Sequence, residues 1–275
     1  MNIKKSFILS VIVTISIAFF ACDMSDNEKS NTSMVSKNGS AANSRLAPLD
    51  FQTIQFNIPN PFIMTSIHPE AAYVFPVALA VSGDGLTTAA TDGYPGNYRG
   101  SVYIYKYAPI SNWTWEEIIP HDGSAFDRFG SSIALSNDGT TLAIGAWGDD
   151  DNGTDSGSVY MYKKFGSTWY FWQKLQPSDA ATNDRFGGTL EMSNDGNTIV
   201  IGALGKNSLK GAAYVFTYGY YGWYQSQKLT DSSGYSGDRF GGDLSLSPDS
   251  SILAIHSIHT KNIFMYTKSG STYSY

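Results

Sequence analysis

The tetrapeptide Asp-Arg-Phe-Gly occurs three times in this chain, at residues 127–130, 184–187 and 238–241. Seven residues after each Phe, a serine opens a short polar turn, at 136–139, 193–196 and 247–250. Phe75 stands at the same distance before a fourth such turn, Ser-Gly-Asp-Gly at 82–85. Self-similarity at a fixed spacing is typical of repeat architectures. The chain therefore contains four repeats, which begin near Phe75, Phe129, Phe186 and Phe240.

Each repeat carries the same succession of short apolar segments. In the second repeat these are residues 132–135, 142–145, 157–162 and 169–172. They are rich in β-branched and aromatic residues and are separated by Asp-Gly or Gly-containing turns, which indicates β-strands. No segment after residue 22 shows a helical period. Four strands in each unit of about 55 residues are typical of a propeller blade, so we expect an all-β fold.

The recurring Phe-Gly pair, followed by Gly-Ala at 145–146 and 202–203, resembles the FG-GAP repeat of integrin α-type β-propellers. The match is closest to a bacterial subclass with short Ser-x-Asp-Gly turns. The resemblance covers residues 75–266 and implies a β-propeller of four-stranded antiparallel blades. Residues 47–275 have room for four blades, either as a closed ring, with residues 51–56 as a candidate closing strand, or as a partial ring. The first and last repeats depart from the pattern, with Pro76 after Phe75 and His256-Ser257 in place of Gly-Ala.

The N-terminus has the pattern of an export signal. Lys4 and Lys5 precede an apolar run over residues 7–21, which is shorter than a bilayer-spanning helix. Cys22, the only cysteine, follows Ala21 directly and resembles the lipidated cysteine of bacterial lipoproteins, although Phe19 stands where an aliphatic residue is usual. We therefore predict a signal peptide over 1–21, a flexible tether over 22–46 that starts at lipidated Cys22, and a propeller over 47–275. An ordinary signal peptide cleaved near Ala21 is the alternative.

Composition excludes several other classes of protein. One cysteine in 275 residues excludes a disulfide framework and any Cys-x-x-Cys metal site. A formal net charge of −6 argues against a nucleic-acid partner. The predicted partners are the membrane, through the lipid anchor, and a protein or glycan ligand.

One loop is a candidate calcium site. Integrin-type repeats hold calcium in a longer acidic loop, but the Ser-Asn-Asp-Gly turn here is too short to surround the ion, so the calcium sites of the family do not transfer. One loop later, Asp149, Asp151 and Asp155 surround Gly153 and can offer oxygens to Ca²⁺. A solvated acidic connection is the alternative.

Two other groups of residues recur or stand out. The arginines of the tetrapeptide, Arg128, Arg185 and Arg239, are expected to form hydrogen bonds or salt bridges between blades. An aromatic segment offers four candidates for a ligand-binding surface, with packing between blades as the alternative: Tyr218, Tyr220, Tyr221 and Trp223.

No catalytic motif appears in the sequence, so we assign no catalytic residue. Two function classes follow. The first is a binding or adhesion module, anchored to the cell envelope, that presents a rigid propeller surface to a protein or glycan. The alternative is an envelope hydrolase or lyase with its site at the mouth of the propeller channel.

Overall fold

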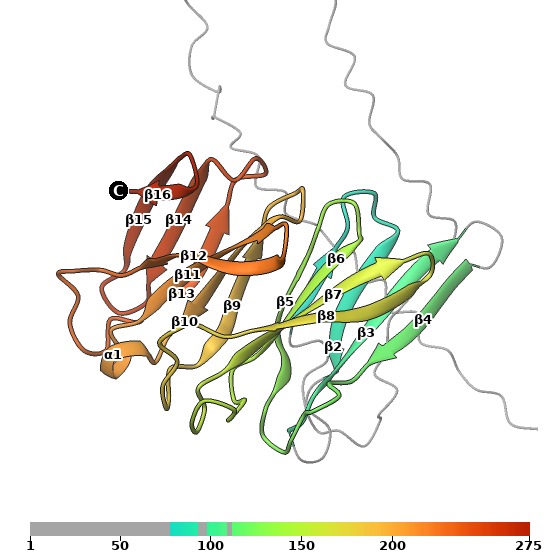
Figure 1. The fold of residues 1–275 in the computed structure, drawn as a ribbon, viewed down its shortest axis with the longest axis horizontal. Coiled ribbons are helices and arrows are strands. Elements are labelled where there is room, and N and C mark those ends of the chain that lie inside the picture. The colour runs from blue at the N-terminus through green and yellow to red at the C-terminus, as the bar shows by residue number, and fades with distance from the viewer. Residues whose placement is uncertain (1–77, 93–97, 109–111) are drawn as a thin grey trace, which may run out of the picture. The chain divides into compact units, whose positions relative to one another are not determined.

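The computed structural model describes residues 78–92, 98–108 and 112–275, all within the unit Pro59–Tyr275. They form four antiparallel sheets of four strands each, and the strands of a sheet pair in chain order. We number the sheets 1 to 4 in chain order; Figure 1 shows them from teal to red. The predicted all-β architecture of four-stranded propeller blades is confirmed.

The sixteen strands follow the four repeats. Sheet 1 contains β1 (Leu79–Val81), β2 (Thr87–Asp92), β3 (Ser101–Ala108) and β4 (Asn112–Ile118). Sheet 2 contains β5 (Phe129–Leu135), β6 (Thr141–Ala146), β7 (Ser158–Phe165) and β8 (Thr168–Leu175). Sheet 3 contains β9 (Phe186–Met192), β10 (Thr198–Ala203), β11 (Ala212–Gly219) and β12 (Gly222–Leu229). Sheet 4 contains β13 (Phe240–Leu246), β14 (Ile252–Ser257), β15 (Asn262–Ser269) and β16 (Thr272–Ser274).

Most of the hydrophobic core lies between the sheets, in three clusters that each join two neighbouring sheets, and a smaller fourth cluster lies within sheet 1. β10 shows how one strand serves two of them, because successive side chains point to opposite faces. Ile199 and Ile201 belong to the cluster shared with sheet 2, whereas Val200 belongs to the cluster shared with sheet 4. Every residue of β10 is consequently buried, which explains why its sequence is apolar without alternation.

The phenylalanine of each described repeat anchors its sheet to the sheet before it. Phe129, Phe186 and Phe240 are all fully buried, as the repeat pattern predicts. The neighbouring sheet approaches these residues through a glycine. At Gly157, where φ is 83°, an added Cβ would lie 2.1 Å from the carbonyl oxygen of Phe186, so no larger residue fits there.

The Ser-x-Asp-Gly turns connect the sheets to one another at one end. Within a turn, the Ser136 hydroxyl donates to Asp138 (2.6 Å) and accepts from the Thr141 N–H (2.9 Å). Between turns, the N–H of the second residue donates to the carbonyl of the second residue in the next turn, from Gly83 to Asn137 (2.8 Å), Asn137 to Asn194 (3.1 Å) and Asn194 to Pro248 (3.2 Å). Pro248 has no N–H, so this series of bonds ends at the fourth turn.

A second set of bonds joins the outer strands. The Gln173 amide on β8 donates to the carbonyl of Trp223 and accepts its N–H, both at 2.9 Å. Gln227 on β12 makes the same pair of bonds with Tyr273 (2.8 and 2.7 Å). Each glutamine side chain thus forms with one residue of the next sheet the pair of backbone hydrogen bonds that a neighbouring strand would form.

The structure bears on two further sequence-based predictions, the absence of helix and the closure of the ring. The sequence predicts no helix, but the structure has one four-residue helical segment among the described residues, α1 (Lys206–Leu209). Asn207 and Ser208 in this segment have left-handed φ values of 51° and 58°. Strong contacts between described strands join the sheets in chain order only, from sheet 1 to sheet 4, as in the partial-ring alternative. Phe75, residues 51–56, Cys22 and the boundary at 46–47 lie outside the described residues. Within the described ranges, no helix is long and apolar enough to span a membrane.

Candidate functional site

The Asp-Arg-Phe-Gly segments form similar turns at the start of β5, β9 and β13. The carboxylate of each aspartate accepts the N–H of the residue three positions earlier, from Ser124 (2.5 Å), Ala181 (2.8 Å) and Tyr235 (2.5 Å). The arginine that follows adopts a left-handed φ, between 54° and 57°, in all three copies. The motif therefore buries its Asp and Phe and leaves each arginine only partly buried.

Two of these arginines contact the same tryptophan. Trp147 follows β6 directly, and its ring centroid lies 4.1 Å from the guanidinium carbon of Arg128 and 5.1 Å from that of Arg185. Arg128 belongs to sheet 2 and Arg185 to sheet 3, so the indole bridges two sheets through cation–π contacts. We call these three residues the Arg–Trp–Arg stack. The contact of Arg185 with Trp147 joins two blades, but it is a cation–π contact and not the expected hydrogen bond or salt bridge; Arg128 and Trp147 belong to the same sheet.

The guanidinium groups of the stack retain unused hydrogen-bonding capacity. Within the described part of the chain, neither Arg128 nor Arg185 has a carboxylate within ion-pair distance. The Nε of Arg185 is buried and has no hydrogen-bond partner there. Because a buried donor without a partner costs free energy, such a group is a candidate ligand contact.

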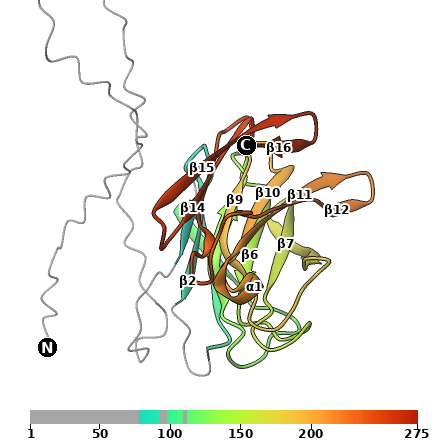
Figure 2. The ribbon, with the colours of Figure 1, turned by 90° about the vertical axis from the view of Figure 1, so that its left-hand side faces the viewer.

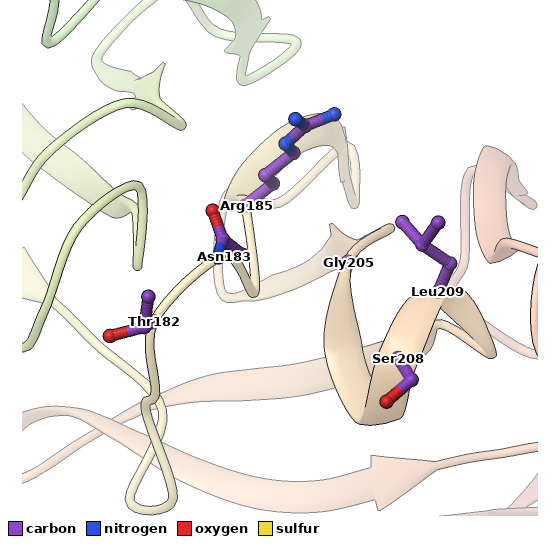
Figure 3. Close-up of a pocket in the computed structure, with 6 residues that line it drawn as sticks. All are labelled: Thr182, Asn183, Arg185, Gly205, Ser208 and Leu209. Atoms are coloured by element: carbon purple, nitrogen blue, oxygen red, sulfur yellow. The ribbon is translucent and has the colours of Figure 1, made fainter.

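A cavity of about 390 Å³ adjoins Arg185. Figure 3 shows its two walls: the loop before β9, with Thr182, Asn183 and Arg185, faces the left-handed turn that carries Ser208 and Leu209. We call this cavity the rim pocket. Its lining presents hydroxyl, amide and guanidinium groups and contains no carboxylate, imidazole or thiol. These are groups that bind polar ligands, and none of them is an ordinary general base.

Backbone strain is concentrated around the same site. Phe126 has a φ of 74° and Tyr98 a φ of 60°, which is unusual for aromatic residues. Their rings stack with centroids 5.7 Å apart, and Arg128 lies 5.7 Å from the Tyr98 ring. Phe126 is nevertheless 59% exposed. A strained and exposed aromatic side chain is more typical of a binding surface than of a purely structural position.

The three predicted calcium ligands are not brought together as a metal site. Asp149 is buried and accepts hydrogen bonds from Ser158 (3.0 Å) and Tyr160 (2.9 Å). The Lys174 ammonium lies 2.8 Å from Asp149 and 2.5 Å from Asp151, so a cation of the chain itself already lies between these carboxylates. Among the described residues, no group of three or more acidic, histidine or cysteine side chains is arranged to hold a metal ion.

The ion pairs also explain the state of Lys174. Burial opposes the charge on its ammonium, but hydrogen bonds to Asp149, Asp151 and Asp122 outweigh this effect and raise the pKa of Lys174. The position that matches Asp149 in sheet 3 is Lys206, a buried lysine 2.7 Å from Asp184. The acidic loop is therefore part of a structural ion-pair cluster.

The four predicted aromatic ligand residues fall into two groups. Tyr220 and Tyr221 are 95% and 97% exposed at the tip of the β11–β12 hairpin, which projects to the right in Figure 2. Trp223 is buried in the cluster between sheets 2 and 3, and Tyr218 packs against that cluster. Strand alternation turns Trp223 toward sheet 2, where it lies in the core and cannot contribute to a ligand-binding surface.

A second cavity, of about 320 Å³, lies among the first strands of sheets 1, 2 and 3. Its lining is largely aliphatic, with residues such as Leu79, Ile133 and Leu190, and includes one carboxyl group, Glu191. Burial raises the pKa of Glu191 to about 7, and the nearby charge of Asp243 adds to the effect.

Comparison with known families identifies the repeat. Residues 113–162 and 169–216 each match the FG-GAP repeat. The two segments extend from β4 to β7 and from β8 to β11, and they include two of the three Asp-Arg-Phe-Gly copies. No curated protein matches the chain.

Solved structures support the same fold. A "putative 6-phosphogluconolactonase" from Bacteroides uniformis aligns with a TM-score of 0.54 and 13% identity, over 78% of this chain and 57% of its own. A protein described in the same words from Bacteroides fragilis aligns with a TM-score of 0.51 and 12% identity, over 71% and 52%. This chain thus spans little more than half the length of either structure. At such identities the likeness shows a shared propeller-like fold only.

Proposed function

We propose that this protein is a binding or adhesion module of the cell envelope, which presents a rigid propeller surface to a protein or glycan ligand. The observation that carries the proposal is the Arg–Trp–Arg stack beside the rim pocket. It combines an indole ring with two partly buried guanidinium groups that have no carboxylate partner among the residues the structure describes, and Arg and Trp are enriched where partners bind. The sheets hold these three residues on strand ends, so the site is preorganised.

Envelope anchoring rests on the sequence of the N-terminus. In this proposal the chain is a lipoprotein of the FG-GAP subclass with short Ser-x-Asp-Gly turns, exported through residues 1–21 and lipidated at Cys22. Residues 22–46 would then be the flexible tether between the lipid and the propeller. Two acyl chains on one cysteine give firm attachment.

An envelope hydrolase or lyase is the second candidate. The observation in its favour is Glu191, because a carboxyl group whose pKa lies near 7 in a cavity is suited to general acid–base chemistry. Because the two candidate functions use different cavities, a single substitution in either cavity can distinguish one function from the other.

The test is a glycan and protein array probed with the purified full-length chain and with the variants Trp147→Leu and Glu191→Gln. A binding module predicts at least one reproducible ligand whose signal is lost with Trp147→Leu and retained with Glu191→Gln. Turnover of any bound glycan that stops with Glu191→Gln would favour the enzyme instead. Circular dichroism of both variants confirms that the fold is retained.

A further inference from the structure

We infer that the Arg–Trp–Arg stack and the rim pocket together bind a carboxylated saccharide, with the sugar carboxylate on the guanidinium groups and the sugar ring in the rim pocket. This inference rests on the proposed function and specifies its ligand class. Nothing in the FG-GAP match or in the likeness to solved structures assigns a ligand to these residues.

Arg128 and Arg185 are placed to bind the carboxylate of the ligand. A guanidinium that stacks on an aromatic ring keeps its N–H groups free along its edge, where they can form two parallel bonds with a carboxylate. Arg128 of sheet 2 and Arg185 of sheet 3 both lie over the Trp147 ring, and neither is neutralised by a carboxylate among the described residues. Arg185 in addition holds a buried Nε–H that no described acceptor satisfies.

The neighbouring acidic loop does not neutralise these arginines. Asp149 and Asp151 bind the Lys174 ammonium, and Asp150 accepts the N–H of Asp155 at 2.7 Å. Arg185 contacts this loop through its backbone, because its N–H donates to the carbonyl of Asp155 at 3.0 Å. Lys174 on β8 therefore holds two of the carboxylates of this loop, and among the described residues none of these carboxylates pairs with the side chain of Arg185.

The side chains that line the rim pocket are suited to bind the sugar ring and its hydroxyl groups. The rim pocket offers the Thr182 and Ser208 hydroxyls and the Asn183 amide, which can donate to and accept from sugar hydroxyls. Leu209 supplies apolar surface in the pocket for the C–H face of a sugar ring. A volume of about 390 Å³ is within the range of small-ligand sites, so the pocket has room for a short oligosaccharide segment.

Asymmetry between the repeats argues that the site is specific and not a by-product of the motif. Arg239 occupies the same motif position in sheet 4, with the same left-handed φ of 54°. The positions that match Trp147 are Leu204 in sheet 3 and Ile258 in sheet 4, so Arg239 has no corresponding tryptophan. Arg239 is consequently a matched control within the same chain.

The experiment is a calorimetric titration of the purified full-length chain with trigalacturonate, and in parallel with its methyl ester, which keeps the sugar rings and removes the negative charges. We expect trigalacturonate to bind and the ester to bind at least about tenfold more weakly, because hydrogen bonds to charged groups are the stronger ones. Arg185→Gln and Arg128→Gln should each weaken trigalacturonate binding about tenfold, and Arg239→Gln should leave it within about twofold. Thermal melts of the three variants identify any loss of fold.

The inference is overturned by equal binding of acid and ester, by an equal effect of Arg239→Gln, or by no binding of trigalacturonate to the folded wild-type chain. The proposed function is decided separately, because the array with Trp147→Leu can still reveal a protein or a neutral glycan as ligand. If sodium acetate alone displaces trigalacturonate at equal concentration, the site recognises a free carboxylate and the saccharide assignment is wrong.

Discussion

Replacing Phe186 by alanine should destabilise the propeller strongly. The ring is fully buried, with centroids 5.6 Å from Tyr214 and 5.9 Å from Phe216, in the cluster that joins sheets 2 and 3. A Phe-to-Ala change at such a site typically costs about 3–5 kcal/mol of unfolding free energy, from lost burial and the remaining cavity. For a unit of this size, each kcal/mol lowers the melting temperature by about 2–4 °C, so we expect a decrease of about 6–20 °C.

The assay is urea unfolding of the wild-type and variant chains, followed by tryptophan fluorescence, with a thermal melt in parallel. Phe165→Ala is the control, because that ring is 57% exposed on the β7–β8 hairpin and its loss should cost about 1 kcal/mol or less. The backbone bond from the Phe186 N–H to the carbonyl of Ser156 (3.0 Å) persists in the variant, so the difference reports the side chain. A loss for Phe186→Ala no larger than that for Phe165→Ala would refute the role of the motif phenylalanine as the anchor between sheets.

Three further predictions test the anchor, the calcium hypothesis and the pH dependence. Cys22→Ser should abolish metabolic palmitate labelling and release the protein from the membrane fraction; unchanged labelling would rule out the lipoprotein proposal. The melting temperature should be the same in calcium and in chelator, because the Lys174 ammonium already lies between Asp149 and Asp151; a calcium-dependent rise that Asp151→Ala removes would restore the calcium site. Burial raises the pKa of Asp127 to about 6 and that of Glu191 to about 7, above the value of about 4 in an unfolded chain. The folded state therefore binds more protons than the unfolded state between these values. The free energy of unfolding should consequently fall as pH rises from about 4 to 7. Asp127→Asn should reduce this fall, as measured by urea unfolding at several pH values between 4.5 and 7.5. An unchanged slope of unfolding free energy against pH would contradict the role given to Asp127.

The repeated features of the fold were predictable from the sequence because each has a local physical signature. Buried strands such as β10 are marked by an unbroken apolar run, and the turns between strands are marked by Asp and Gly. The recurrence of Phe at a nearly constant spacing predicted its burial, which the structure confirms at Phe129, Phe186 and Phe240. The family resemblance, inferred from the same residues, agrees with the two matched FG-GAP segments.

The candidate site was not predictable in the same way, because it depends on what differs between repeats. Trp147 occurs in only one repeat, and its contacts with Arg128 and Arg185 join residues from two sheets. The sequence did offer one signal, since Trp147 stands directly after the Gly-Ala pair where the next two repeats have Leu204 and Ile258. This difference between otherwise similar repeats is the sequence signal of the site.

Two sequence-based site hypotheses failed to anticipate long-range contacts. The calcium hypothesis considered the spacing of Asp149, Asp151 and Asp155 but not Lys174, whose ammonium reaches the loop from the end of β8. The aromatic hypothesis grouped Trp223 with Tyr220 and Tyr221 by proximity in sequence. Alternation along β12 places Trp223 in the core, whereas the turn leaves Tyr220 and Tyr221 in solvent.

Hydrogen–deuterium exchange of the full-length chain, with and without saturating trigalacturonate, tests most directly where the ligand binds. We expect added protection in residues 124–130, 182–188 and 205–210, which contribute Arg128, Arg185 and the turn of the rim pocket. Exchange at the β11–β12 hairpin around Tyr220 and Tyr221 should remain unchanged. Protection confined to that hairpin, or to the cavity around Glu191, with none at the Arg–Trp–Arg stack, would contradict the account.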